Sequence, residues 1–392
     1  MIKPADRLNH FQTGIFAALD QKKDELIKQG KTVYNLSVGT PDFPPSQDVR
    51  DTLIKAASDP VNYRYSLGDL PELLEAVRDY YQRRFGVQGL SLNEIMSVNG
   101  TQEGMGHLGM ALCNPGDVVL LPDPGYPVFY AGAYFGQAEI ACYPLRRENG
   151  FLPVLEEIPE SVLRRTKYMV VSYPSNPVGA AAPVSMYEKL IAYAKKYDFL
   201  IVNDNAYSDI IFDGRQGISF LSLPGAKDCG VEFFSLSKSF NVTGARISFL
   251  VGNKAVIDAL KLLRTQYDFG MFYPVQYAAI QALQTPRDVI LKQCEVYQQR
   301  RDALCGGLRR IGWPVPDSQG TMFVFAPIPE PYTSSTDFCK ELMEQTGVIG
   351  TPGTAFGEMG EGYIRFALTK PVEELEEIVA VIDRSGILKQ GR

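Results

Sequence analysis

Residues 235–246 read Ser-Leu-Ser-Lys-Ser-Phe-Asn-Val-Thr-Gly-Ala-Arg and directly follow Val231–Phe234, a run that is apolar except for Glu232. Such a run is typical of a buried strand, so Lys238 would leave the end of that strand with a partly desolvated ammonium. Desolvation lowers the pKa of a lysine, and the neutral amine can attack a carbonyl carbon to form a Schiff base. Small hydroxyl residues beside it leave room for a ligand, and Arg246 could bind a phosphate through its guanidinium. Taken alone, the same residues could also form a serine-rich surface turn.

Polar residues also follow other predicted strands. Apolar runs predict strands over 95–98, 117–121, 167–173, 199–203, 231–234 and 247–251, and helical patterns alternate with them between residues 70 and 284. This alternation predicts an α/β domain with a mainly parallel sheet. Just past the carboxyl ends of five of these strands come Gly100, Tyr126, Asn176, Asp204 and Lys238. Because ligands bind at that edge of an open α/β sheet, we expect these residues to share one site.

The two ends of the chain predict a second, smaller unit. Residues 1–30 have a helical pattern, and residues 32–39 predict a short strand. A long helix over 286–311 would bridge to an α+β unit with strands over 322–328 and 363–368 and helices over 336–345 and 372–382. We therefore expect an N-terminal arm and part of the small domain in 1–45, a large domain in 46–285 and a small domain in 286–392.

Composition and charge exclude several classes of protein. The chain has 392 residues, of which 45% are hydrophobic and 21% charged, and this balance is typical of a soluble globular protein. A net charge of −6 without a basic block argues against binding to nucleic acid or to a membrane. No apolar signal segment opens the sequence, so we expect a cytoplasmic protein whose six scattered cysteines are reduced. With only two histidines, we expect neither a metal site nor a Ser/His hydrolase.

The chain resembles the class I aminotransferases, which are fold-type-I enzymes that use pyridoxal 5′-phosphate (PLP). The resemblance runs from residues 36–43 to 362–368. Its motifs are Asn176-Pro177, Asp204-x-x-Tyr207, the Ser-x-Ser-Lys…Thr-Gly-x-Arg pattern that ends at Arg246, and Tyr363-x-Arg365. The resemblance implies a large PLP-binding domain with a mainly parallel seven-stranded sheet flanked by helices, and a small α+β domain.

The resemblance also implies how the cofactor would be held. Lys238 would bind PLP covalently and, once released, move the α-proton of the substrate. Asp204 would face the pyridine nitrogen and keep it protonated, which makes the ring an electron sink. Tyr207 and Asn176 would form hydrogen bonds to the phenolic oxygen of the ring, and Tyr126 would stack on it.

The same resemblance assigns a phosphate site and a partner. The cofactor phosphate would lie against groups near two strand ends, namely Gly100, Thr101, Gln102, Ser235, Ser237 and Arg246. Tyr63 matches the tyrosine that reaches the phosphate of the partner subunit in the family, so the resemblance implies a homodimer with shared active sites. Arg365 would bind the substrate α-carboxylate, helped by the Gly39 backbone and by Asn176.

Several segments look closer to the LL-diaminopimelate aminotransferases than to the family at large, namely residues 81–87, 212–214, 224–227 and 356–358. Two positions depart from that group. Ser66-Leu67 stand where that group usually has a glutamate. Gly100-Thr101-Gln102 stand where the group often has the tripeptide Gly-Ser-Lys or Gly-Ala-Lys. Residues 267–273 are aromatic and lack the arginine of dicarboxylate-specific relatives.

The expected reaction is therefore a ping-pong transamination between an L-amino acid and a 2-oxo acid, with 2-oxoglutarate as the expected acceptor. LL-diaminopimelate, aspartate, alanine and aromatic amino acids remain open as donors. One alternative is a PLP-dependent C–S β-lyase on the same fold. A second alternative is a PLP-binding regulator without catalysis, which is disfavoured because the chain has no basic face or fused DNA-binding segment.

Overall fold

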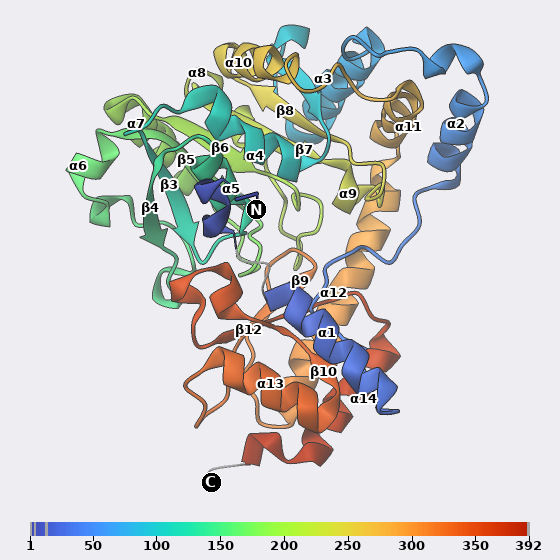
Figure 1. Ribbon diagram of the computed structural model, residues 1–392. Coiled ribbons are helices and arrows are strands. Elements are labelled where there is room, and N and C mark those ends of the chain that lie inside the picture. Colours follow the sequence, from blue (N-terminus) through green and yellow to red (C-terminus); the bar gives the residue numbers. More distant parts are fainter. Residues whose placement is uncertain (1, 4, 12–14, 390–392) are drawn as a thin grey trace.

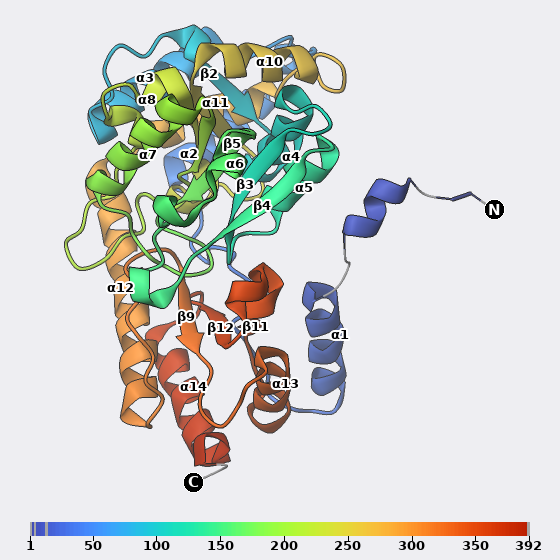
Figure 2. The same cartoon turned by 90° about the vertical axis from the view of Figure 1, so that its left-hand side faces the viewer.

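The computed structural model describes residues 2–3, 5–11 and 15–389. Two bodies lie one above the other (Figures 1 and 2). The large lobe is a seven-stranded sheet with helices on both faces, and the small lobe is built on a three-stranded sheet. Helix α12 (Arg287–Arg310) runs along the side of both lobes and joins them (Figure 2).

The strands of the large lobe are β2 (Ile95–Val98), β3 (Val118–Asp123), β4 (Glu139–Pro144), β5 (Thr166–Ser172), β6 (Leu200–Asp204), β7 (Gly230–Ser235) and β8 (Ser248–Gly252). Their order in the sheet is β2-β8-β7-β6-β5-β3-β4. Strand β8 is antiparallel to both of its neighbours, and the remaining pairs are parallel. The carboxyl ends of β2, β3, β5, β6 and β7 therefore share one edge, as the polar residues after these strands predicted.

Strand β4 was missed by the sequence analysis. Its sequence, Glu-Ile-Ala-Cys-Tyr-Pro, has a single β-branched residue and begins with an exposed glutamate. It lies at the edge of the sheet, where it pairs with β3 alone and stays partly solvated. An edge strand needs no continuous apolar run, so its pattern is weaker than that of the buried strands beside it.

Ten helices of the described chain belong to the large lobe: α2 (Gln47–Ala57), α3 (Pro71–Phe85), α4 (Thr101–Leu112), α5 (Val128–Phe135), α6 (Glu160–Leu163), α7 (Val184–Tyr197), α8 (Ala226–Cys229), α9 (Leu236–Ser239), α10 (Lys254–Arg264) and α11 (Tyr273–Leu283). No helix in this part of the chain is long and apolar enough to cross a membrane.

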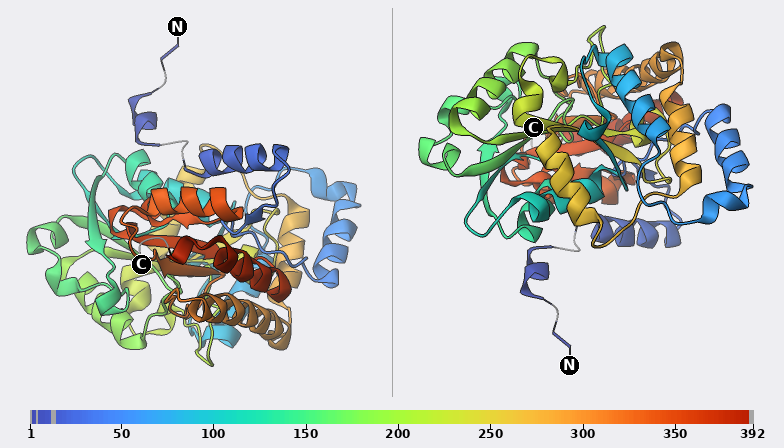
Figure 3. Two further views of the ribbon diagram at one scale, coloured as in Figure 1. Left: turned by 90° about the horizontal axis from the view of Figure 1, so that it is seen from below. Right: turned by 90° about the horizontal axis from the view of Figure 1, so that it is seen from above.

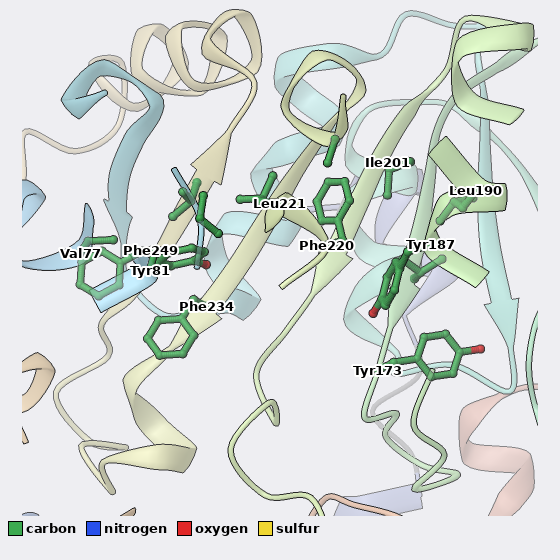
Figure 4. Packing of buried hydrophobic residues seen from close by; sticks show 14 of the residues in the cluster. Val77, Tyr81, Tyr173, Tyr187, Leu190, Ile201, Phe220, Leu221, Phe234 and Phe249 are labelled. Atoms are coloured by element: carbon green, nitrogen blue, oxygen red, sulfur yellow. The ribbon is translucent and has the colours of Figure 1, made fainter. Parts of the chain in front are cut away.

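The two faces of the sheet carry separate apolar cores because side chains alternate along a strand. Phe234 and Phe249 point to one face, where they pack with Val77 and Tyr81 of α3 (Figure 4). Their neighbours in the sequence point to the other face, where Phe233 and Leu250 belong to a second cluster together with residues of α4, α5 and α10. Both faces are covered, so the central strands read as continuous apolar runs.

The small lobe contains β9 (Phe323–Pro327), β11 (Thr351–Pro352), β12 (Tyr363–Ala367), α13 (Ser335–Thr346) and α14 (Val372–Ser385). The strand order β11-β12-β9 is antiparallel throughout. The N-terminal segment joins this lobe, because β1 (Tyr34–Asn35) pairs in parallel with β10 (Val348–Ile349). In the view from below, α1 (Ile15–Lys28) lies beside the orange and red C-terminal elements (Figure 3).

Two predictions for the N-terminal segment were inaccurate. Residues 1–30 do not form one helix, since Asp6–His10 is a short 3₁₀ helix, Phe11 is extended, and α1 begins at Ile15. Residues 1, 4 and 12–14 of that prediction lie outside the described residues. The strand predicted over 32–39 is limited to Tyr34–Asn35, because the backbone beyond it turns away to line the cavity described below.

The contact between α4 and α5 gives a prediction of stability. A Cβ atom at Gly109 would lie 1.9 Å from the carbonyl oxygen of Gly132, so Gly109→Ala must push the two helices apart. We expect a loss of about 1–3 kcal/mol, the range for overpacking a core, and a lower midpoint of thermal unfolding. Gly106→Ala on the same helix is the matched control, because its Cβ would meet nothing closer than 3.9 Å. That control should be neutral or stabilising, since alanine is the better helix former. Equal midpoints for the two variants would contradict this close packing.

Candidate active site

A cavity of about 450 Å³ lies where the carboxyl edge of the large sheet meets the small lobe. It is lined by most of the residues that the sequence singled out, namely Gly39, Thr101, Gln102, Tyr126, Asn176, Asp204, Tyr207, Ser235, Ser237, Lys238, Arg246 and Arg365. Gly100 does not line the cavity itself but lies against the guanidinium of Arg246, which does. Tyr63 is not part of the lining. The structure thus brings together residues that are up to 326 positions apart in the chain (Gly39 to Arg365).

Lys238 enters the cavity from α9, immediately after β7. Its Nζ donates a hydrogen bond to the Gly39 carbonyl oxygen at 3.0 Å and lies 5.7 Å from the centre of the Tyr207 ring. Burial, together with the positive charges of Arg365 and Arg246, lowers the pKa of Lys238 to about 8, and the charge of Asp204 partly offsets these effects. A neutral amine is therefore accessible near physiological pH, as a nucleophile or a base requires.

Asp204 ends β6 on the same side of the sheet and is almost fully buried. Its Oδ1 has no hydrogen-bond partner among the described residues. Burial raises the pKa of this carboxyl to about 7, against a smaller opposing effect from the Lys238 charge. A buried carboxylate oxygen without a donor is costly, so this atom is suited to a ligand that brings a positively charged N–H group.

One end of the cavity is suited to an anion. Helix α4 begins at Thr101, so the free N–H groups of its first turn point into the cavity edge with the positive end of the helix dipole. Gly100 has a φ of +86°, and a Cβ there would lie 2.2 Å from Nη2 of Arg246. Glycine is needed here, because any residue with a Cβ would keep Arg246 from approaching this turn so closely.

Hydroxyl groups connect the two sides of this anion-binding end. Thr101 Oγ1 donates to Ser248 Oγ at 3.2 Å, and Ser248 Oγ donates to Ser235 Oγ at 3.1 Å. Ser235 in turn accepts a hydrogen bond from the Ser237 backbone N–H at 3.1 Å. Ser248 was not identified from the sequence. It is a single polar residue in the otherwise apolar strand β8, and a buried serine in such a strand is a signal of a polar site.

Arg365 approaches from the opposite side, on β12 of the small lobe. Nη1 donates to Asn176 Oδ1 at 2.9 Å, and Nη2 donates to the Ser37 carbonyl oxygen at 2.8 Å. The guanidinium lies 4.1 Å from the Phe323 ring and 4.6 Å from the Phe356 ring. Burial lowers its pKa to about 10.

Within the described part of the chain, no carboxylate forms an ion pair with Arg365, and its Nε has no hydrogen-bond partner. A buried cation without an anion is unfavourable unless a ligand supplies one. A carboxylate is the expected ligand, because its two oxygens match the fork of a guanidinium. Phe323 and Phe356 were missed by sequence analysis, since they lie in ordinary apolar segments with no distinguishing pattern.

Tyr63 does not reach this cavity. Its ring is 65% exposed, its hydroxyl donates to the Ala57 carbonyl oxygen at 2.9 Å, and its edge meets Phe272 at 5.3 Å. A role for Tyr63 at an active site therefore requires a second copy of the chain. No group of three or more His, Cys, Asp or Glu side chains suited to a metal ion is present among the described residues.

Comparison with known proteins identifies the class to which this fold and site belong. The model of the family "Aminotransferase class I and II" matches residues 31–382. An LL-diaminopimelate aminotransferase of Dehalococcoides mccartyi is 41% identical over 97% of this chain and 98% of its own. The apo structure of BacF from Bacillus subtilis superposes with a TM-score of 0.94, at 34% identity and 98% coverage of both chains. A single mutant of Thermus thermophilus aspartate aminotransferase has a TM-score of 0.92 at 26% identity, covering 98% and 100%.

The chain belongs to the class I and II aminotransferases, as its motifs predicted. It is therefore an aminotransferase that uses PLP, and its α/β fold is that of fold type I. The residues present fit the cofactor on grounds independent of the family. The amine of Lys238, the lone carboxylate oxygen of Asp204 and the anion-binding end at Thr101 and Arg246 match the aldehyde, the pyridine nitrogen and the phosphate of PLP.

The pKa of Lys238 gives a pH prediction for cofactor binding. The neutral amine is the reactive form, so the rate at which cofactor-free enzyme takes up PLP should rise with pH through a midpoint of about 8. Asp204→Asn is the informative variant, because the Asp204 charge raises the pKa of Lys238 and its removal should move the midpoint lower. The measurement is the visible absorption of bound cofactor against time at each pH. A midpoint near 10.5, the ordinary pKa of an exposed lysine, would contradict a buried Lys238.

Proposed function

We propose that the enzyme moves the amino group of an L-amino acid to a 2-oxo acid in two half-reactions at this one cavity, with 2-oxoglutarate as the acceptor. The observation that supports it most is the convergence of Lys238, Asp204 and Arg365 on one cavity from two lobes. An amine, a carboxylate oxygen without a donor and a guanidinium without an anion are the groups needed to bind PLP and an amino acid at one site.

In this mechanism each residue has a distinct part. Arg365 and Asn176 bind the α-carboxylate of the amino acid and fix its α-carbon near Lys238. Once released from the cofactor, the amine of Lys238 would act as the base that holds and moves the α-proton at Nζ. PLP, when bound, supplies the ring that accepts the electron pair left by that proton. Asp204 would face the ring nitrogen and keep a proton there, because a buried carboxylate oxygen without a donor is stabilised by a cation beside it.

The donor is addressed by two observations. The curated relatives at about 40% identity are named LL-diaminopimelate aminotransferases, which makes that amino acid the first donor to test. The charged side chains that line the cavity are Asp204, Lys238, Arg246 and Arg365, and each is already assigned to the cofactor or to the α-carboxylate. A second charged group on the substrate would therefore need a partner outside this lining, so aspartate, alanine and aromatic amino acids stay in the test as donors.

We also propose that two copies of the chain form the working unit. Exposed aromatic side chains gather in two edge-to-face pairs, Tyr63 with Phe272 and Tyr65 with Phe269. The exposed fractions of Tyr65 and Phe269 are 81% and 61%, which is high for large apolar side chains. In a homodimer these rings would be covered, and Tyr63 could reach the phosphate site of the other copy. Sedimentation should give about twice the chain mass of 43.5 kDa; a single-chain mass would contradict the shared site.

The domain limits predicted from the sequence, 1–45, 46–285 and 286–392, are part of the same proposal. Most residues of one apolar cluster lie in the large lobe and most of another lie in the small lobe, which supports a division into two folding units. The clusters overlap where the lobes meet, since Phe325 and Phe356 join the first and Tyr207 and Phe212 join the second. A cytoplasmic location also remains a proposal. It agrees with free cysteines at all six positions.

The test of the proposed function is a half-reaction assay without acceptor. LL-diaminopimelate, aspartate, alanine and phenylalanine are each mixed with the PLP-loaded enzyme, and the visible absorption of the cofactor is followed. A donor should bleach the absorption once per site, and 2-oxoglutarate should restore it. Pyruvate formed from a cysteine conjugate without any acceptor would instead favour a C–S β-lyase. Bound cofactor with no response to any donor would favour a regulator without catalysis.

A further inference from the structure

The two lobes meet at a second place, which we call the Asp123 seam. It comprises Asp123 at the end of β3, Gly125 just after it, and Phe356, Gly357 and Met359 in the small lobe. In the small lobe two 3₁₀ turns cover Gly353–Phe356 and Glu358–Gly360. Asp123 Oδ1 accepts a hydrogen bond from the Met359 backbone N–H at 3.1 Å. The Gly125 backbone N–H donates to the Phe356 carbonyl oxygen at 2.7 Å. None of these five residues lines the cavity.

The seam is tightly fitted. Gly357 has a φ of +132°, and a Cβ there would lie 2.0 Å from Asp123 Oδ1. Asp123 is 8% exposed, and within the described chain no lysine or arginine pairs with it. A buried carboxylate without a cation depends on its hydrogen bonds to remain favourable. The backbone N–H groups of the small lobe provide them, so the carboxylate holds the two lobes together at this point.

The seam connects the two walls of the active site. On the small-lobe side, Phe356 packs its ring against the guanidinium of Arg365 at 4.6 Å. On the large-lobe side, Tyr126 follows Asp123 by three residues and lines the cavity. A change in the seam therefore alters the distance between Arg365 and Tyr126 without touching either the substrate or the cofactor.

We propose that Asp123 is a positioning residue for substrate binding, which holds Phe356 and through it Arg365 at a fixed distance from the cofactor wall at Tyr126. This inference rests on the proposed function, because it takes Arg365 as the carboxylate site. It assigns no chemistry to Asp123. Its loss should weaken substrate binding and leave cofactor binding intact, since the phosphate and lysine ends lie in the large lobe.

The first variant, Asp123→Ala, removes the acceptor of the Met359 N–H group. We expect the KM for the amino acid to rise about tenfold, which is the scale of one lost hydrogen bond to a charged group, while kcat and the affinity for PLP stay unchanged. Asp123→Asn keeps an acceptor oxygen at Oδ1 and should restore most of the wild-type KM. A residue that only stabilised the fold would not separate KM from kcat in this way.

The second variant attacks the seam from the other lobe. In Gly357→Ala, Asp123 is intact but the new Cβ must displace its Oδ1, so the same rise in KM is expected. Gly306→Ala is the matched control, because its Cβ would lie 3.6 Å from a flexible arginine end on α12 and far from the seam. This control should leave KM unchanged.

A binding measurement separates this inference from the proposed function. 2-Aminoisobutyrate has an α-carboxylate and an amine but no α-proton, so calorimetry with the PLP-loaded enzyme reports binding without turnover. If the wild type binds it and Asp123→Ala and Gly357→Ala bind about tenfold more weakly, the scale of one such hydrogen bond, the seam is supported even if no donor is turned over. The proposal is overturned if the two variants match the wild type, if Asp123→Asn behaves like Asp123→Ala, or if the variants lose PLP together with substrate affinity.

Discussion

Lys238→Ala should abolish turnover, with a fall in kcat of at least about 10³-fold, since a positioned base alone contributes about 10²–10⁴. The variant removes the amine that we propose binds the cofactor covalently and carries the α-proton. No other lysine lines the cavity in the described chain, so none can replace it directly. The measurement is the steady-state rate with the best donor of the half-reaction assay.

Two further variants make this result specific. Lys238→Arg keeps a positive charge at the position but supplies no nucleophilic amine, so it should be as inactive as alanine. Lys254→Ala removes an exposed lysine that pairs with Asp258 on α10, and it should be fully active. Near wild-type turnover in Lys238→Ala would contradict the account, because no described residue then explains the chemistry.

Arg365→Leu should raise the KM for amino acids and for 2-oxo acids by about 100-fold, because truncating one partner of a buried charged pair typically costs about 2–5 kcal/mol. The affinity for PLP should not change, since Arg365 lies on the small lobe away from the anion-binding end. Arg365→Lys should also bind weakly, because an ammonium cannot form the two parallel hydrogen bonds of a guanidinium.

A comparison with Arg300 separates binding from stability. Arg365 is buried without an anion, so leucine at this position should leave the midpoint of thermal unfolding unchanged or higher. Arg300 is equally buried but binds Asp42 through two hydrogen bonds of 2.8 and 2.6 Å. Arg300→Leu should therefore lower the midpoint. A lower midpoint in Arg365→Leu with an unchanged KM would mean that Arg365 is a structural residue.

Much of the large lobe could be predicted because its strands are buried on both faces. Runs such as Val118–Leu121 are apolar throughout, and polar residues past such runs mark the strand ends. Lys238 and Asp204 could therefore be placed at one edge from the residues alone. The edge strand β4 was not predicted because only one of its six residues is buried. The prediction of a single helix in the N-terminal segment was inaccurate because the spacing of apolar residues does not show where one helix ends and another begins.

Which residues of the two lobes come together in one site could not be derived from local sequence patterns. Arg365 is 127 positions from Lys238, and only the family resemblance assigned the two to one site. Ser248, Phe323 and the Asp123 seam carry no motif, because their part in the site comes from packing between segments distant in sequence. Tyr63 shows a different limit, since the role proposed for it in a second copy of the chain leaves it outside the cavity of its own copy.

The central claim is that Lys238 holds the cofactor, and one measurement tests it most directly. The PLP-loaded enzyme is treated with borohydride, which reduces a Schiff base to a stable amine, and the digested protein is analysed by mass spectrometry. The account predicts one modified peptide, with the mass of the reduced cofactor on residue 238. Cofactor mass on another lysine, or none on any peptide of a coloured enzyme, would contradict it.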